Sequence, residues 1–244
     1  MNQVAGSVLA PPTHARVIHA LDSVRDPELD EPVTSLGFVA SCEVSEDGVA
    51  TIHLRLPTYF CAPNFAFLMV ADAYDAVSAV SGVSQAVVML DDHFASDAIN
   101  DGVAARAGFV GSFGAEAVDE LDTLRADFIR KAVLAGTDRV GRPLLAAGAT
   151  TAQLVGMTLG ELPPSADLDR LRRRRSEIGL SNDDASALMI DVTTGEPIAA
   201  DDLRLHLNKA RLTRVNIEAN GSVCRGMLRE RYATAGHGQV EEDT

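Results

Sequence analysis

The chain is poor in the residues that build disulfide frameworks and aromatic cores. Among its 244 residues are three cysteines, no tryptophan and 5% aromatic residues. Cys42, Cys61 and Cys224 lie far apart, without a CxxC pair or the even cysteine number of small secreted domains. No apolar run approaches the roughly 20 residues that cross a bilayer, and the N-terminus lacks the basic and apolar regions of a signal peptide. We therefore expect a cytoplasmic protein without a membrane partner.

Common catalytic motifs are also missing. The sequence has no GxGxxG that opens a helix, no GxxxxGK[ST], no HExxH and no GxSxG. The formal net charge of −14 repels phosphate backbones, so we expect no nucleic-acid partner. The only basic cluster is RLRRRR, at residues 170–175. It predicts a helix face paired with nearby acids, and a dock for an acidic partner is the alternative.

Apolar periodicity predicts a compact α/β domain over residues 13–110. Thr13 caps a predicted helix that stops at the prolines of DPELDEP. GFVASCEV and the run after SEDGVA then predict a β-hairpin, whose first strand has an apolar face made of Phe38, Ala40, Cys42 and Val44.

A helix and a third strand follow the predicted hairpin. Residues 63–79 fit a helix ended by Gly82, and QAVVML fits a short buried strand. The crossover rule then places this strand parallel to its neighbour. Together these elements predict a small mixed sheet of about three strands with flanking helices.

The second half has a helical pattern, and we predict a mainly helical domain over residues 115–235. It contains an amphipathic helix ended by Gly136, shorter helices around Pro163 and Pro164, and a long late helix with a break at Gly221. Residues 1–115 carry 4 Arg and Lys against 14 Asp and Glu, whereas the remainder carries 17 against 21, which supports a boundary near residue 110. The ends, residues 1–12 and 236–244, are expected to be disordered. The fold class is therefore α/β of the α+β type, with a helical C-terminal domain.

Cys61 is the leading candidate for chemistry, because it stands between a strand-like and a helix-like run in LPTYFCAPNFAFLMV. Unpaired N–H groups and the positive end of a helix dipole favour a thiolate there, which is the form that binds metal. The alternative is a small buried hydrophobic residue beside Phe60 and Phe65. Cys42 is expected in the core, and Cys224 has no evident partner.

Two further groups of polar residues flank predicted elements. Asp26 and Glu28 follow the first helix, where they serve either a site or a solvated turn. Asp91, Asp92 and His93 follow the third strand, at the edge where α/β sheets collect ligands. His93 is a candidate ligand together with Cys61 or a carboxylate, and a capping cluster for a helix at residues 96–106 is the alternative.

Taken together, these segments resemble the PaaD/SufT-like metal-sulfur (iron-sulfur) cluster assembly family over residues 13–105. DPE followed by LGFV looks like the opening motif of that family, Cys61 falls at its cysteine, and Phe94 falls near its usual tryptophan. The family commonly has one proline directly after its cysteine and another before it. In this chain Ala62 and Phe60 occupy those places, and the prolines are displaced to Pro57 and Pro63. No resemblance covers residues 115–244.

The resemblance implies an accessory protein and no enzyme activity. Such a maturation factor would help to assemble or activate an iron or iron-sulfur centre in a client metalloenzyme, and a binuclear-iron monooxygenase is one hypothesis. The metal residues implied are Cys61, Asp26, Glu28 and His93, with iron or an iron-sulfur cluster as transient cargo and zinc as another metal. One cysteine cannot hold a metal alone, so the hypothesis includes a homodimer that joins two sites.

Two other functions stay open at this stage. The first is a metal-free adaptor or folding chaperone for such a client, favoured by the isolated cysteine. The second is a thiol enzyme with an activated Cys61, although no resolving cysteine or paired histidine is evident in the sequence.

Overall fold

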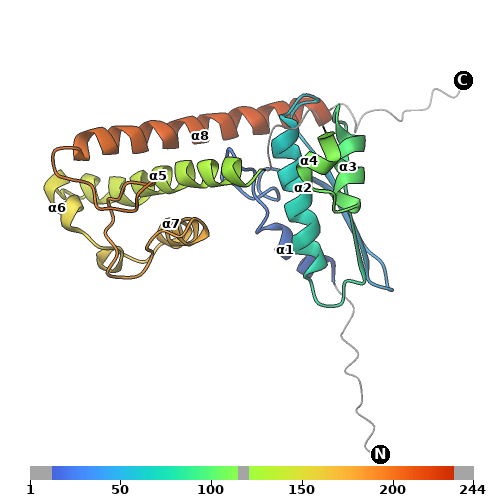
Figure 1. Ribbon diagram of the computed structural model, residues 1–244, viewed down its shortest axis with the longest axis horizontal. Coiled ribbons are helices and arrows are strands. Elements are labelled where there is room, and N and C mark those ends of the chain that lie inside the picture. Colours follow the sequence, from blue (N-terminus) through green and yellow to red (C-terminus); the bar gives the residue numbers. More distant parts are fainter. Residues whose placement is uncertain (1–12, 115–120, 234–244) are drawn as a thin grey trace, which may run out of the picture. The chain divides into compact units, whose positions relative to one another are not determined.

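The computed structural model describes residues 13–114 and 121–233, which form two compact units (Figure 1). The α/β unit falls within residues 1–121 and 221–244, and the helical unit comprises residues 122–220. The final turns of the last helix therefore group with the α/β unit, although they follow the helical unit in sequence. The expectations for residues 1–12 and 236–244 lie outside the described residues. No helix among the described residues is long and apolar enough to span a membrane.

The α/β unit is built on one three-stranded mixed sheet of order β1-β2-β3. Its elements are α1 (His14–Leu21), β1 (Val39–Val44), β2 (Val49–Arg55), α2 (Pro63–Ser78), β3 (Gln85–Asp91), α3 (Ser96–Ala104) and α4 (Gly108–Phe113). β2 pairs antiparallel with β1 and parallel with β3. The predicted hairpin, the parallel third strand and the mixed sheet are thus confirmed.

Helices cover one face of this sheet. Both α2 and α3 pack on β3, and α1 packs against β1 and α2 (Figure 1). Along β2 every second side chain is buried, which gives the core residues Ala50, Ile52 and Leu54. Thr13 caps α1 by accepting a hydrogen bond from the Arg16 N–H, as the sequence predicts.

Two details of this unit differ from the prediction. The register shifts between Val39 and Ser41, so Ala40 is exposed and does not share the face of Cys42 and Val44. A β-bulge inserts an extra residue and thereby changes which side chains face inward. In addition, α2 ends at Ser78, and Gly82 lies in the following turn with φ of 95°.

The helical unit contains four helices and a short 3₁₀ turn among its described residues. These are α5 (Asp122–Ala146), α6 (Thr151–Gly156), η2 (Leu159–Glu161), α7 (Ala166–Glu177) and the first part of α8 (Leu203–Ala233). Their shared core is leucine-rich and includes Val133, Leu154, Leu159, Leu171 and Leu188. The predicted helical character of the second half is confirmed.

Neither glycine expected to interrupt a helix does so. α5 continues through Gly136 to Ala146. This glycine lies against α7, where a Cβ would stand 3.2 Å from Leu171 Cδ1. α8 likewise runs through Gly221 without a break. Here a Cβ would approach Glu31 Oε1 to 3.1 Å. Both glycines thus allow close packing and do not end a helix.

The basic cluster 170–175 lies on α7. Arg172 pairs with Asp184 at 2.6 Å and Arg174 with Glu177 at 2.5 Å, as expected for a helix face paired with acids. Arg175 is different, because it is fully buried and donates to the carbonyls of Ala187 (2.8 Å) and Leu188 (2.6 Å). It therefore anchors the loop after α7.

Candidate functional site

Cys61 lies in the loop between β2 and α2, two residues before the first residue of the helix. Its thiol is half-buried and free, and Sγ lies 3.3 Å from Thr58 Oγ1, a contact in which either group can donate. Pro63 at the start of α2 has no N–H, and the N–H groups of Phe65 and Ala66 bond to the Ala62 carbonyl. The position of Cys61 before a helix is as predicted, whereas the polar group recorded at its sulfur is the hydroxyl of Thr58.

His93 contacts the backbone of Cys61 and not its thiol. The Ala95 N–H donates to Nδ1 at 3.2 Å, so Nε2 carries the proton and donates to the Cys61 carbonyl oxygen at 2.8 Å. Burial lowers the pKa of His93, which is 3% exposed, and the bond to Cys61 opposes this shift. Both ring nitrogens are engaged, and the neutral ring positions the Cys61 loop.

The other polar residues after β3 are also engaged in local contacts. His53 Nδ1 lies 3.0 Å from Asp91 Oδ1, across the β2–β3 pair. The His93 carbonyl accepts bonds from the N–H and the hydroxyl of Ser96 at the start of α3. These contacts form a turn at the start of α3, whose N-cap residue, Ala95, makes no side-chain capping bond.

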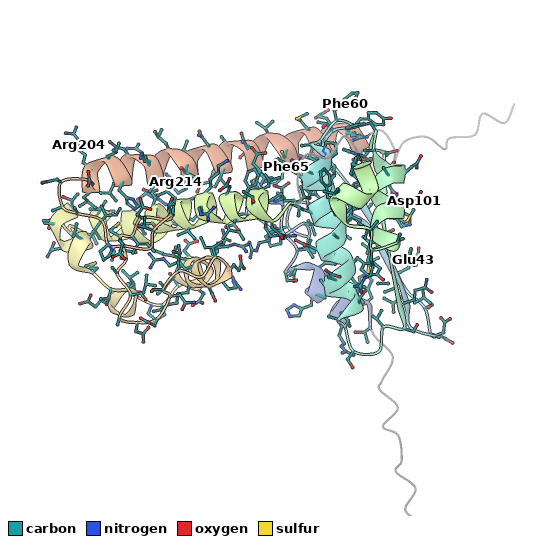
Figure 2. The ribbon with its side chains drawn as sticks, viewed as in Figure 1. Glu43, Phe60, Phe65, Asp101, Arg204 and Arg214 are labelled. Carbon is teal, nitrogen blue, oxygen red and sulfur yellow. The ribbon has the colours of Figure 1, made fainter. Side chains whose placement is uncertain are left out.

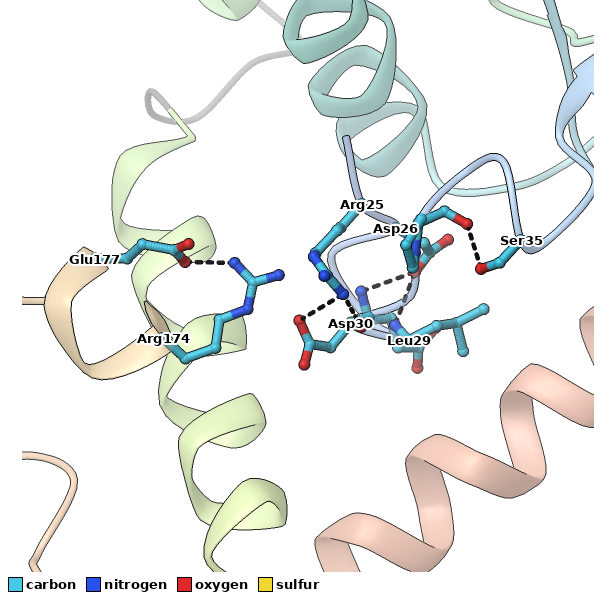
Figure 3. Close-up of polar contacts among 9 residues, drawn as sticks. Arg25, Asp26, Leu29, Asp30, Ser35, Arg174 and Glu177 are labelled. Atoms are coloured by element: carbon cyan, nitrogen blue, oxygen red, sulfur yellow. Dashed lines mark hydrogen bonds and ion pairs between the residues drawn. The ribbon is translucent and has the colours of Figure 1, made fainter. Parts of the chain in front are cut away.

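Asp26 organises the DPEL turn (Figure 3). Its Oδ1 accepts hydrogen bonds from the N–H groups of Glu28 (2.9 Å) and Leu29 (2.8 Å). Burial raises the pKa of Asp26 to about 6, although these two bonds lower it and the charges of Glu28 and Glu31 raise it further. Glu28 itself is exposed. Asp26 thus has a definite structural role in the turn, next to an exposed carboxylate.

Exposed aromatic side chains surround the Cys61 loop. Tyr59, Phe60 and Phe94 are 48%, 75% and 48% exposed, and we call them the aromatic cluster. The ring centroids of Phe60 and Phe94 are 5.9 Å apart, and the Phe94 N–H donates to the Tyr59 carbonyl at 3.2 Å. Phe60 projects outward beyond the N-terminal end of α2 (Figure 2). Apolar rings held at the surface around a thiol favour contact with another protein.

Cys224 is a further candidate, although the sequence shows no evident partner for it. It lies on the last turns of α8, within the α/β unit, and is half-buried. Burial raises the pKa of its thiol to about 11, and the charges of Asp26, Cys61 and Glu28 raise it as well. The charges of the DPEL turn and of Cys61 therefore act on the Cys224 thiol. Its only signal in the sequence is its spacing, three residues after Gly221 and four before Leu228, which puts the three on one side of a helix.

Cys42 lies apart from this group, in the middle of β1 opposite Ile52. Burial alone raises the pKa of its thiol. Within the described residues, no three His, Cys, Asp or Glu side chains come close enough together to hold a metal ion. The described residues therefore contain no complete, preformed set of ligands for a metal at Cys61.

Comparison with known proteins gives one match. Residues 14–88 match the family model described as iron-sulfur cluster assembly protein. The matched segment contains Asp26, Glu28 and Cys61, whereas His93 and Cys224 lie beyond it. This confirms the resemblance found from the sequence and supports a role in iron-sulfur assembly, without support for zinc. No curated protein and no solved structure matches the chain.

Proposed function

We propose that the protein is a maturation factor that delivers iron or an iron-sulfur cluster to a client metalloenzyme, because residues 14–88 match the family model of an iron-sulfur cluster assembly protein. Cys61 is the thiolate that takes the cargo, and the protein turns over no small substrate. The binuclear-iron monooxygenases are the client class we favour.

The observation that carries the proposal is the setting of Cys61. Its free, half-buried thiol lies within the matched segment and next to the aromatic cluster, in which Phe60 is 75% exposed. A carrier needs a ligand that cargo can reach and leave, together with a surface on which the receiving protein docks. Thiolate is a preferred ligand of iron-sulfur clusters. The loop supplies both requirements within a few residues.

Local contacts hold this loop in place without occupying the sulfur fully. The bond from His93 fixes the Cys61 carbonyl, and Thr58 lies beside Sγ. Preorganised ligands reduce the entropy that binding must overcome. The role of His93 on this proposal is to position the loop, and Asp26 shapes the neighbouring turn.

The test is anaerobic loading with ferrous iron and sulfide, followed by desalting and iron analysis. Wild-type protein should retain iron and pass it to an apo-ferredoxin acceptor. Cys61→Ser should lose both properties. Cys42→Ser is the matched control, since it removes another half-buried thiol that lies apart from the site. Equal retention by the wild type and Cys61→Ser would show that the proposed ligand is wrong.

The second candidate is a metal-free adaptor that binds the client through the aromatic cluster. It is favoured by the exposure of Phe60, 75%, which is large for a phenylalanine. In a binding assay with a candidate hydroxylase, Phe60→Ala would then weaken binding, whereas Cys61→Ser would leave binding and client activation unchanged. Loss of activation in Cys61→Ser with binding retained would favour the carrier.

A further inference from the structure

The final turns of α8 present one face to the α/β unit. At the start of this face, Arg225 pairs with Glu31 at 2.7 Å and Gly221 lies close to the same carboxylate. One turn later, buried Leu228 packs on Gly37, where a Cβ would stand 3.4 Å from Cδ2. Positions three and four apart share a helix face, so these residues form a continuous contact stripe.

The stripe continues to the loops that border Cys61. Arg231 donates to the Leu56 carbonyl at 3.0 Å, and the Tyr232 hydroxyl donates to Asp92 Oδ2 at 3.3 Å. Leu56 ends the chain segment just before the Cys61 loop, and Asp92 directly precedes His93. The final turns of α8 therefore extend from the contact with Glu31 to the two loops that border Cys61.

Cys224 belongs to this stripe. It stands three residues after Gly221 and four before Leu228, both of which are buried. It therefore points towards the α/β unit, between the contact at Glu31 and the contact at Leu56. The groups whose charges act on its thiol are Asp26, Glu28 and Cys61, together with Arg225 of its own helix. The charges of the DPEL turn and of Cys61 therefore reach the thiol that this helix face presents to the unit.

We propose that Cys224 is the second thiol of the Cys61 site, so that α8 supplies one cargo ligand and the matched segment the other. This inference rests on the proposed function. It also assigns a purpose to the end of a helix that lies outside the matched segment. On this proposal two sulfur atoms of this chain hold the cargo, and the charges of Asp26 and Glu28 act on the same region.

The chemistry of such a site suits transient cargo. Each thiol loses its proton to solvent as a sulfur-metal bond forms, and no electron is transferred. Iron in thiolate sites commonly takes four ligands, so two thiols leave positions for a donor or a client. The carboxylates of Asp26 and Glu28 favour a cation in this region, and Arg225 is paired with Glu31. A half-complete ligand set holds iron and still releases it.

Phenylarsine oxide tests the geometry without reference to activity. Its arsenic forms two As–S bonds with a pair of nearby thiols and releases one water molecule. Intact-protein mass spectrometry of the anaerobic full-length chain should show one arsenical adduct that survives an excess of a monothiol. The adduct should be lost in Cys61→Ser and in Cys224→Ser and kept in Cys42→Ser. Cys224→Ala, with helicity checked by circular dichroism, guards against misfolding of the serine variant.

Iron retention tests the function of the pair. Loss of either Cys61 or Cys224 should weaken ferrous iron binding by roughly 10-fold to 100-fold or more, the range seen even for loss of an outer-shell partner. Iron retention that needs Cys61 and is unchanged in both Cys224 variants would overturn this inference and leave the proposed function standing. No retention by the wild type would overturn both. An arsenical adduct that persists in the Cys224 variants would also refute the pairing.

Discussion

Arg231 on the last turn of α8 donates a hydrogen bond of 3.0 Å to the backbone carbonyl of Leu56, the residue that directly follows β2. The same guanidinium donates to the Asp92 carbonyl at 2.5 Å. One side chain near the end of the described chain thus joins both loops that border the Cys61 site. The final turns of α8, which belong to the α/β unit, are therefore part of the architecture of the site.

Replacing Arg231 should loosen these loops. Arg231→Met keeps much of the apolar stem and removes both bonds to backbone carbonyls, at a cost of about 1–3 kcal/mol in unfolding free energy. Amide exchange across residues 56–61 and 92–95 should quicken. Arg229→Met is the control, because Arg229 is exposed on the same turn. Unchanged exchange in Arg231→Met would mean that the loops hold themselves in place.

The raised pKa of Asp26 predicts that the stability of the protein depends on pH. Its pKa is raised to about 6 in the folded protein, from 3.8, chiefly by burial. The folded state therefore binds the proton more tightly, and stability falls as pH rises from about 4 through 6. Glu28, Glu31 and the thiol of Cys224 face the same region.

Asp26→Asn should remove the free-energy cost of ionising a buried carboxyl group, while its side-chain oxygen still accepts both hydrogen bonds of the turn. At pH 7.5 the metal-free variant should be more stable than the wild type by on the order of 2 kcal/mol. The gain should vanish near pH 4, where the wild-type carboxyl is protonated. Urea unfolding at both pH values measures the difference. A gain of the same size at pH 4 would contradict the role of burial.

Substitutions at two helical glycines should change the stability of the protein in opposite directions. A Cβ at Gly136 would lie 3.2 Å from Leu171 Cδ1, whereas nothing lies within 4 Å of a Cβ at Gly226. Gly136→Val should destabilise the helical unit by about 1–3 kcal/mol through overpacking. Gly226→Ala should stabilise by about 0.5–1 kcal/mol through helix propensity. Thermal unfolding of the two variants, with the wild type as reference, measures both effects, and a stable Gly136→Val would show that α5 and α7 can move apart.

Replacing Arg175 should lower the free energy of unfolding more than replacing its neighbours in the basic cluster. It is fully buried, and burial lowers its pKa to about 10. Arg175→Met leaves buried carbonyls of Ala187 and Leu188 without their donor, which should cost about 2–4 kcal/mol. Arg173→Met is the matched control on the same helix, because Arg173 is exposed. Denaturant unfolding should separate the two variants, and equal midpoints would refute the anchoring role.

Local patterns in the sequence predict most of the elements. Thr13 before an apolar repeat predicts α1, and alternation on either side of SEDGVA predicts the hairpin, because caps and periodicity act over a few residues. Local patterns give a wrong prediction where a residue is placed by packing against a distant part of the chain. Gly136 and Gly221 look like helix ends, yet each makes room for a residue that lies far away in sequence.

The candidate site shows the same division. The sequence by itself determined that Cys61 precedes a helix and that the segment around it resembles an iron-sulfur assembly family, since both depend on adjacent residues. Only the tertiary structure decided that His93 bonds the backbone of Cys61 and that the charge of Asp26 acts on the Cys224 thiol. The contact of α8 with the α/β unit joins residues nearly 200 positions apart, as in Arg225 with Glu31. Such contacts arise from the packing of whole elements, whereas periodicity within one element reports only which face is apolar.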